Sequence, residues 1–217
     1  MVELITGLRA ERVRANLELA RSAIAATGRS LDEVQILAAV KYVAVEELPV
    51  LAQAGIELLG ENRAQDLAAK AGAWPDRFTW DYIGHLQSRK VRDVLPYVRY
   101  IHSVASDSVL AQLGRHAAPD TEVLVEVNVA QEPGKSGVAP IELDAFLARC
   151  PVTVVGLMTM PPMTGDPERS RPRFAALREL AGRHGLEQLS MGTSQDYVIA
   201  TQEGATIVRL GTSLYAS

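Results

Sequence analysis

The sequence has little cysteine, little lysine and no long apolar run, and each scarcity excludes a class of protein. Cys150 is the only cysteine, so no disulfide forms within the chain, which fits a reducing compartment. No apolar stretch approaches the roughly 18 residues of a membrane-spanning helix. The N-terminal residues lack the basic-then-apolar order of a secretion signal, so a cytoplasmic protein without a membrane partner is expected.

Charge is also modest and slightly acidic. The 217 residues carry 22 Lys and Arg against 26 Asp and Glu, a formal net charge of −4. This balance excludes a general nucleic-acid coat protein. Apolar residues make up 47% of the chain, which suffices for a globular core and argues against disorder. Chemistry that needs a primary amine has few candidates, because the lysines are Lys41, Lys70, Lys90 and Lys135.

Short apolar segments alternate with amphipathic ones along the chain. Residues 5–27 are a predicted helix, because their apolar side chains fall on one stripe. The predicted strands are residues 34–40, 56–59, 79–83, 98–102, 122–129, 152–158, 187–190 and 205–210. The predicted helices between them are residues 45–54, 62–71, 88–95, 106–116, 140–149, 167–184 and 195–202.

This alternation predicts an α/β fold with parallel strands that are buried on both faces. An open doubly wound sheet and a closed (β/α)8 TIM barrel both satisfy the pattern, and the strand count favours the barrel. No linker, repeat or low-complexity segment interrupts the chain. A single domain over residues 1–217 is therefore expected, with residues 1–30 forming an N-terminal helical segment that packs on the barrel.

Polar residues follow the predicted strands, at the ends where barrel active sites lie. Gly192, Thr193 and Ser194 follow the seventh predicted strand and are expected to open a helix. A similar Gly-Thr-Ser run, residues 211–213, follows the eighth strand. Backbone N–H groups and hydroxyls in these two loops are typical of a barrel phosphate site, and simple turn and cap chemistry is the alternative.

Lys41 follows the first predicted strand, so its amine is expected at the barrel mouth in a half-buried position. Desolvation favours a neutral amine, which attacks carbonyl groups and forms a Schiff base. The alternative is a lysine that extends into solvent. Lys70 and Lys90 lie on predicted helices, where a solvated ammonium is expected. An aldehyde that carries a phosphate would satisfy both Lys41 and the phosphate loops, and pyridoxal 5′-phosphate (PLP) is one.

Several longer motifs stand in order between residues 34 and 215. They are residues 37–41 (LAAVK), 59–62 (LGEN), 83–90 (IGHLQSRK), 101–104 (IHSV), 135–137 (KSG), 156–162 (GLMTMPP), 189–194 (LSMGTS) and 209–212 (RLGT). In this order they resemble the pyridoxal phosphate homeostasis protein family, also called the YggS or PROSC family. The resemblance implies a single barrel like the N-terminal domain of bacterial alanine racemase, with PLP held as a Schiff base.

The resemblance also assigns roles residue by residue. Lys41 matches the Schiff-base lysine, and Arg209 matches the arginine that faces the pyridine nitrogen. Asn62 matches a position near the polar substituents of the ring, and Met158 lines the pocket. The phosphate-binding positions and those beside them are Gly192, Thr193, Ser194, Gly211 and Thr212. No metal site is implied.

The chain departs from the family pattern without losing an assigned ligand. Val40 stands where Ser or Thr usually precedes the lysine, so a hydroxyl near the Schiff base is lost. Ala44 stands where Pro is usual, Thr193 replaces the usual Met, and Ala216 replaces a Gly.

Three functions remain open at this stage. The resemblance implies a monomeric carrier that buffers PLP and delivers it to apoenzymes, with no established turnover. A PLP-dependent racemase or lyase is the alternative; it needs a second base, and the added β-domain that usually supplies one is not expected here. His85 and His102 are candidates for that base, although a structural role is the simpler interpretation of each. A cofactor-free aldolase that uses Lys41 is the third possibility.

Overall fold

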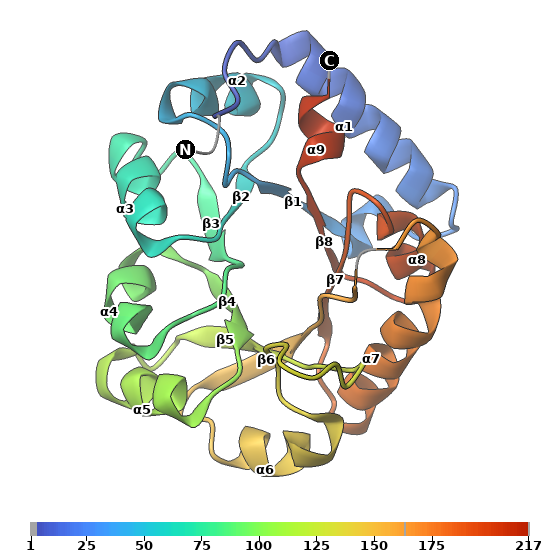
Figure 1. Ribbon diagram of the computed structural model, residues 1–217. Coiled ribbons are helices and arrows are strands. Elements are labelled where there is room, and N and C mark those ends of the chain that lie inside the picture. Colours follow the sequence, from blue (N-terminus) through green and yellow to red (C-terminus); the bar gives the residue numbers. More distant parts are fainter. Residues whose placement is uncertain (1–3, 163, 217) are drawn as a thin grey trace.

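Eight parallel strands close into a barrel in which each strand pairs with the next and β8 pairs with β1 (Figure 1). This computed structural model describes residues 4–162 and 164–216, so the first three residues of the predicted segment 1–30 lie outside the described residues. The predicted TIM barrel is confirmed, and the doubly wound alternative is wrong. No helix of the described residues is long and apolar enough to cross a membrane.

Strands and helices alternate around the barrel as the sequence pattern predicts. The strands are β1 (Gln35–Ala39), β2 (Leu58–Glu61), β3 (Thr79–Tyr82), β4 (Tyr100–Val104), β5 (Glu122–Glu126), β6 (Thr153–Met158), β7 (Gln188–Thr193) and β8 (Ile207–Leu210). The helices are α1 (Ala10–Ala25), α2 (Leu48–Gln53), α3 (Ala64–Ala73), α4 (Val91–Val94), α5 (Asp107–His116), α6 (Leu143–Ala148), α7 (Arg171–Arg183), α8 (Tyr197–Gln202) and α9 (Thr212–Tyr215). Short 3-10 turns precede or follow several of them, at Leu31–Glu33, Val45–Glu47, Ser88–Lys90, Leu95–Tyr97, Pro140–Glu142 and Pro167–Ser170.

The main hydrophobic core lies between the strands and the surrounding helices. Leu59, Ile101 and Val123 are fully buried in it, as expected for strands covered by helices. The inside of the barrel is filled as well. A Cβ atom added to Gly60 would lie 2.2 Å from Cδ2 of Leu37, so these two strands approach too closely for a larger side chain. The barrel is therefore a packed core, and room for a ligand exists only at its ends.

The N-terminal helix begins later than predicted, at Ala10 instead of residue 5. Ile5 forms an isolated bridge with Val43, and Gly7 has a φ of 72°, which helical backbone does not allow. The Glu47 carboxylate accepts hydrogen bonds from the backbone N–H groups of Gly7 and Leu8, at 2.6 and 2.9 Å. Residues 5–8 are thus bound to the loop that follows β1.

Helix α1 packs on the barrel through the stripe that its sequence predicts. Val13, Leu17, Ala20 and Ile24 are buried on one face. The helix also lies beside α9 (Figure 1). There the Asn16 amide donates to the carbonyl oxygens of residues 214 and 216, at 3.1 and 3.0 Å. Segments from the two ends of the chain are thereby joined.

Two strand boundaries differ from prediction in ways that affect the site. Strand β7 continues to Thr193, so Gly192 and Thr193 end a strand instead of opening a helix, and α8 starts only at Tyr197. Strand β5 ends at Glu126, and the next residue, Val127, forms an isolated bridge with Val138 in the following loop.

Candidate functional site

Lys41 lies in a tight turn just beyond the end of β1. The turn is closed by a hydrogen bond from the N–H of Val43 to the carbonyl of Val40, 2.9 Å long. The Lys41 side chain is exposed, and its Nζ lies 5.0 Å from the centre of the Tyr42 ring. The expected half-burial is therefore wrong, because Lys41 stands two residues past the last strand residue and no neighbouring strand covers it. The amine is freely accessible to a ligand.

Asn62 follows β2 at the neighbouring strand end and carries an unsatisfied polar atom. Its Oδ1 is buried and has no hydrogen-bond partner among the described residues. The backbone of Asn62 is held tightly. Tyr82 donates to its carbonyl at 3.0 Å, and a Cβ added to Gly84 would lie 2.1 Å from that oxygen. A buried acceptor without a donor costs about 1–3 kcal/mol, which a ligand with a suitable donor would recover.

Ser194 and the loop after β8 form a cluster of hydrogen-bond donors on the other side of the strand ends. The Ser194 hydroxyl oxygen accepts from the backbone N–H groups of Gly211 and Ser213, at 3.1 and 3.3 Å. The Ser213 hydroxyl also lies 3.0 Å from it. Thr212, at the start of α9, is exposed beside them. This group of two amides and several hydroxyls has the chemistry of a phosphate cradle.

Gly192 and Thr193 shape this cradle, and the polar groups of Thr193 are already occupied. Gly192 has a φ of 90°, and a Cβ there would lie 2.5 Å from the Ala200 Cβ, so glycine is required. The Asp196 carboxylate accepts from the N–H and the hydroxyl of Thr193, at 2.8 and 3.1 Å. Thr193 is therefore a supporting residue of this cradle.

Arg209 lies on β8 with its guanidinium inside the barrel, only 4% exposed. Its Nη1 donates to the carbonyl and to the hydroxyl of Ser190, at 2.8 and 2.5 Å, and Nη2 donates to the Thr159 carbonyl at 3.0 Å. Burial lowers the pKa of Arg209 to about 10, while the charges of Asp196 and Glu126 act in the opposite direction. The side chain remains a fixed cation at neutral pH.

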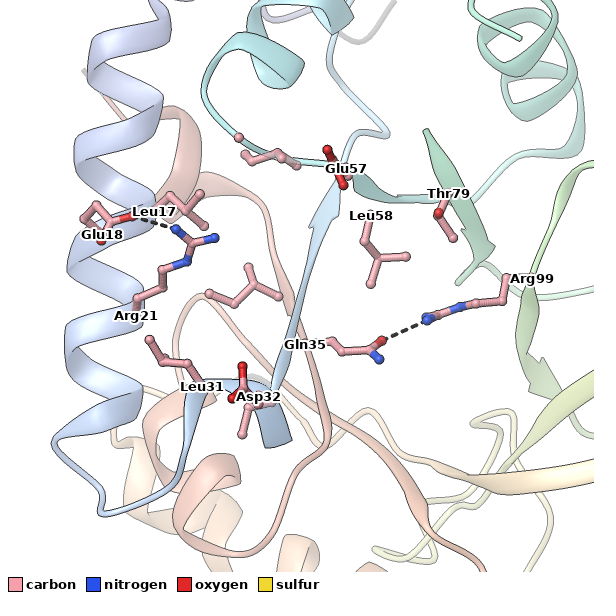
Figure 2. A pocket seen from close by; sticks show the side chains of 14 residues that line it. Leu17, Glu18, Arg21, Leu31, Asp32, Gln35, Glu57, Leu58, Thr79 and Arg99 are labelled. Carbon is pink, nitrogen blue, oxygen red and sulfur yellow. Dashed lines mark hydrogen bonds and ion pairs between the residues drawn. The ribbon is translucent and has the colours of Figure 1, made fainter. Parts of the chain in front are cut away.

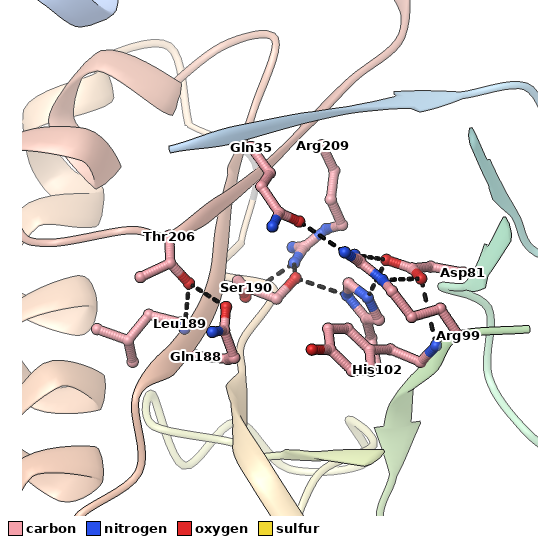
Figure 3. A network of polar contacts seen from close by, with 10 residues as sticks. Gln35, Asp81, Arg99, His102, Gln188, Leu189, Ser190, Thr206 and Arg209 are labelled. Carbon is pink, nitrogen blue, oxygen red and sulfur yellow. Dashed lines mark hydrogen bonds and ion pairs between the residues drawn. The ribbon is translucent and has the colours of Figure 1, made fainter. Parts of the chain in front are cut away.

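A chain of buried polar groups stands behind Arg209 (Figure 3). His102 lies between Ser190 and Asp81, with its Nδ1 2.8 Å from the Ser190 hydroxyl and its Nε2 3.0 Å from Asp81 Oδ2. Arg99 binds the same carboxylate with two nitrogens, at 3.1 and 2.7 Å. His102 is fully buried and engaged at both ring nitrogens. It is thus a structural residue, and the interpretation of His102 as a second base is wrong.

The charges of this chain are set by burial and by neighbours. Burial lowers the pKa of His102 more than Asp81 raises it, so the imidazole is neutral. Burial alone would raise the pKa of Asp81, but the hydrogen bonds and charges of His102 and Arg99 outweigh it and hold this pKa below its ordinary value. Nε2 of His102 therefore donates to the carboxylate, while Nδ1 accepts from Ser190.

A large open cavity lies at the opposite end of the barrel from Lys41, Asn62 and Ser194 (Figure 2). It has a volume of about 620 Å³ and lies between α1 and the residues at which β1 to β4 begin, such as Gln35, Leu58, Thr79 and Arg99. None of the residues assigned by the family resemblance lines it. A smaller cavity of about 250 Å³ lies beside the predicted site and is lined by Glu126, Lys135, Ser136 and Met160, among others.

No family model matches the sequence. A pyridoxal phosphate homeostasis protein of Aquifex aeolicus is 37% identical over 219 residues, which cover 94% of this chain and 96% of that protein. The chain belongs to the pyridoxal phosphate homeostasis protein family. A Pseudomonas aeruginosa protein of the same name is 34% identical and is covered over 90% of its length.

Solved structures agree with membership of the pyridoxal phosphate homeostasis protein family. PipY of Synechococcus elongatus, solved with PLP bound, superposes with a TM-score of 0.80 at 29% identity, over 94% of this chain and all of that one. Alanine racemase of Corynebacterium glutamicum superposes with a TM-score of 0.75 at 18% identity, over 63% of its chain. The latter similarity shows that the barrel is of the alanine racemase type.

The remaining predicted residues of this family member take varied positions. Met158 ends β6 and is 3% exposed, paired in register with Glu126 and Ser190. His85 is exposed.

The prediction of a solvated ammonium for Lys70 is wrong, because Lys70 is only 5% exposed and forms an ion pair with Glu61 at 2.6 Å. The burial of Lys70 was not predicted, because its partner Glu61 lies on a strand face that the sequence pattern assigns to apolar side chains.

We expect this member of the pyridoxal phosphate homeostasis protein family to lose stability in mild acid because of His102. The pKa of His102 is lowered on folding, so below about pH 6.5 the unfolded chain binds a proton that the folded chain excludes. Between pH 6.5 and 5.5 this costs about 1 kcal/mol of unfolding free energy. Urea unfolding at the two pH values should show that loss in wild type and in the surface variant His116→Gln, but not in His102→Gln. Equal pH slopes in all three would contradict the assignment.

Proposed function

We propose that the chain binds PLP at the carboxyl end of the barrel and serves intracellular PLP homeostasis by buffering and delivering the cofactor. The observation that carries the proposal is that four features, each suited to a different part of PLP, lie at the same end of the barrel. These are an accessible lysine, a buried amide oxygen without a partner, a cluster of amide and hydroxyl donors, and a fixed arginine. A PLP-bound relative covers 94% of the chain, which supports the same site.

Each residue has a distinct task in this proposal. The Lys41 amine attacks the aldehyde carbon and forms a C=N bond, and the aldehyde oxygen leaves as water, which gives a Schiff base. Ser194, Gly211 and Thr212 hold the phosphate through hydroxyl and amide donors. Asn62 supplies an acceptor for a polar group of the ring, and Met158 closes the apolar side of the site.

Arg209 explains why we assign a carrier and not a racemase. A bound PLP ring supplies an electron sink for carbanions, and this sink is strongest when the pyridine nitrogen is protonated. An arginine cannot accept a proton and only donates, so it favours the unprotonated nitrogen. The hydrogen bonds from Arg209 to Ser190 and Thr159 fix it in this role. His102 offers no compensating base, because it is enclosed behind Arg209.

The protein should accordingly catalyse little or no amino-acid racemisation. We would incubate PLP-loaded protein with single enantiomers of alanine and serine and resolve the products chirally. Rates far below the roughly 1–1000 s⁻¹ of ordinary enzymes are expected. Racemisation within that range, abolished in Lys41→Ala, would contradict the carrier assignment.

Cofactor delivery itself is the test of the proposed function. PLP-loaded protein is mixed with the apo form of a PLP-dependent enzyme, and recovery of that enzyme's activity is followed with time. We expect the bound cofactor to restore the activity of the apoenzyme, and the activity restored should be proportional to the amount of PLP-loaded protein added. A protein that retains its cofactor while the apoenzyme remains inactive would exclude delivery.

Lys135 is proposed to assist entry and exit of the cofactor. It lies in the loop after β5, ion-paired with Glu132 at 2.8 Å, and lines the smaller cavity beside the site. Lys135→Ala should keep the Schiff base at Lys41 but slow the release of PLP to an apoenzyme, whereas Lys90→Ala should not. Identical release rates in wild type and Lys135→Ala would exclude this role.

The wider setting is also part of the proposal. We expect one PLP-binding domain that acts as a monomer in the cytoplasm and delivers PLP to apoenzymes, without nucleic-acid or membrane partners. Cys150 is the only cysteine of the sequence, which fits a reducing compartment. Burial raises the pKa of its thiol, which keeps it unreactive.

A further inference from the structure

A buried ion pair joins the ends of β1 and β2 directly behind Lys41. Nζ of Lys70, on α3, lies 2.6 Å from Oε1 of Glu61, and the two side chains are 7% and 0% exposed. The same amine donates to the backbone carbonyl of Val40 at 2.6 Å. Since this carbonyl belongs to the peptide bond that leads into Lys41, Lys70 contacts the backbone that carries the proposed Schiff-base lysine.

The other end of the ion pair holds the second strand. Oε2 of Glu61 accepts from the backbone N–H groups of Asn62 and Arg63, at 2.5 and 3.2 Å. The first of these groups belongs to Asn62, whose amide oxygen is unpartnered. The pair therefore connects the backbone at Lys41 to the backbone at Asn62 through an unbroken series of short polar contacts.

Further hydrogen bonds hold the residues that flank Lys41 in the turn. The Val40 N–H donates to the carbonyl of Gly60 at 2.9 Å. The carbonyl of Val40 accepts hydrogen bonds from the Lys70 amine and from the N–H of Val43. Beyond the turn, the N–H of Ile5 donates to the carbonyl of Tyr42 at 2.6 Å. Lys41 is exposed, but hydrogen bonds hold the backbone of the residues on both sides of it.

Stability is a weak explanation for such a pair. Removing two charges from water is costly, and apolar side chains of similar size often replace a buried ion pair without loss. The polar atoms of this pair instead bind backbone groups next to two proposed cofactor ligands. We propose that Lys70 and Glu61 are positioning residues that hold Lys41 in the orientation required for Schiff-base formation. This inference rests on the proposed function.

The expected effect follows from the nature of the reaction. Once the phosphate and ring are bound, attack by Lys41 takes place within one complex, so its equilibrium depends steeply on orientation. Binding that does not involve the aldehyde does not depend on Lys41. Loss of the ion pair should therefore weaken the covalent step and leave non-covalent binding intact.

The double variant Glu61→Gln/Lys70→Met tests this. Removing Lys70 alone would leave a buried unpaired carboxylate and endanger folding, whereas the double variant removes both charges and keeps similar side-chain volumes. Binding is measured with PLP and with pyridoxine 5′-phosphate, which has the same phosphate but an alcohol in place of the aldehyde. The exposed pair Lys90–Asp93, 2.9 Å apart, supplies the matched control Lys90→Met/Asp93→Asn.

We expect the double variant to bind PLP about tenfold to a hundredfold more weakly and to bind pyridoxine 5′-phosphate as wild type does. If the double variant does not fold, Glu61→Asp, which keeps the negative charge but shortens the side chain, should show the same selective loss to a smaller degree. Equal weakening towards both ligands, or no change towards either, would overturn the positioning role. A wild-type protein that binds neither ligand would instead overturn the proposed function, so the two failures are distinguishable.

Discussion

Replacing Lys41 by alanine is expected to abolish covalent attachment of PLP and to leave only weak, phosphate-anchored binding. Well-oriented intramolecular reactions have very large effective concentrations, so the loss of this step should reduce retention by at least about a hundredfold. The visible absorbance of the Schiff base and its trapping by borohydride should both disappear. Folding should be nearly unaffected, because Lys41 is exposed in a turn and surface substitutions cost within about 0.5 kcal/mol.

Lys90→Ala is the matched control, because Lys90 is a lysine on the outer helical layer, ion-paired with Asp93. It should retain both the absorbance and the borohydride trapping. Undiminished trapping in Lys41→Ala would mean that another amine carries the cofactor.

Removing the hydroxyls of the phosphate cradle should have the second largest effect. Ser194→Ala deletes the oxygen on which the N–H groups of Gly211 and Ser213 converge, and Thr212→Ala deletes the exposed hydroxyl beside it. A hydrogen bond to a charged group contributes roughly 1.5–3 kcal/mol, so each variant should weaken PLP retention about tenfold to a hundredfold. Equilibrium dialysis against free PLP would measure the change.

Two comparisons make this measurement specific for phosphate. The loss should be seen with pyridoxine 5′-phosphate but not with pyridoxine, which has no phosphate. Thr153→Ala removes an exposed hydroxyl at the start of β6, at the opposite end of the barrel, and should change nothing. Unchanged retention in the double variant Ser194→Ala/Thr212→Ala would exclude this cradle.

The fold was largely predictable because each strand and helix leaves a local pattern. Buried parallel strands produce short apolar runs, and these runs alternate with amphipathic helices that cover them. Boundaries were less predictable where contacts distant in sequence decide them. Helix α1 starts at Ala10 because Ile5 pairs with Val43, and nothing in the first residues announces that pairing.

The site was predictable where its residues lie in loops that follow neighbouring strands, and not where it depends on side chains from several different strands. The loops after β7 and β8 come together as expected, since neighbouring strand ends meet in a barrel. The burial of Lys70 and the series from Arg209 through Ser190 and His102 to Asp81 were not predicted. Each requires knowing which side chains of different strands share a face, and single-sequence periodicity does not provide that.

The most direct test of the central claim is to locate the cofactor on the wild-type chain. PLP-loaded protein is reduced with borohydride, digested with trypsin and analysed by mass spectrometry. Because the reduced Lys41 resists cleavage, the label should appear on one peptide, residues 30–63, instead of on a fragment that ends at residue 41. A label on Lys70, Lys90 or Lys135 in place of Lys41, or no label at all, would contradict the proposed site.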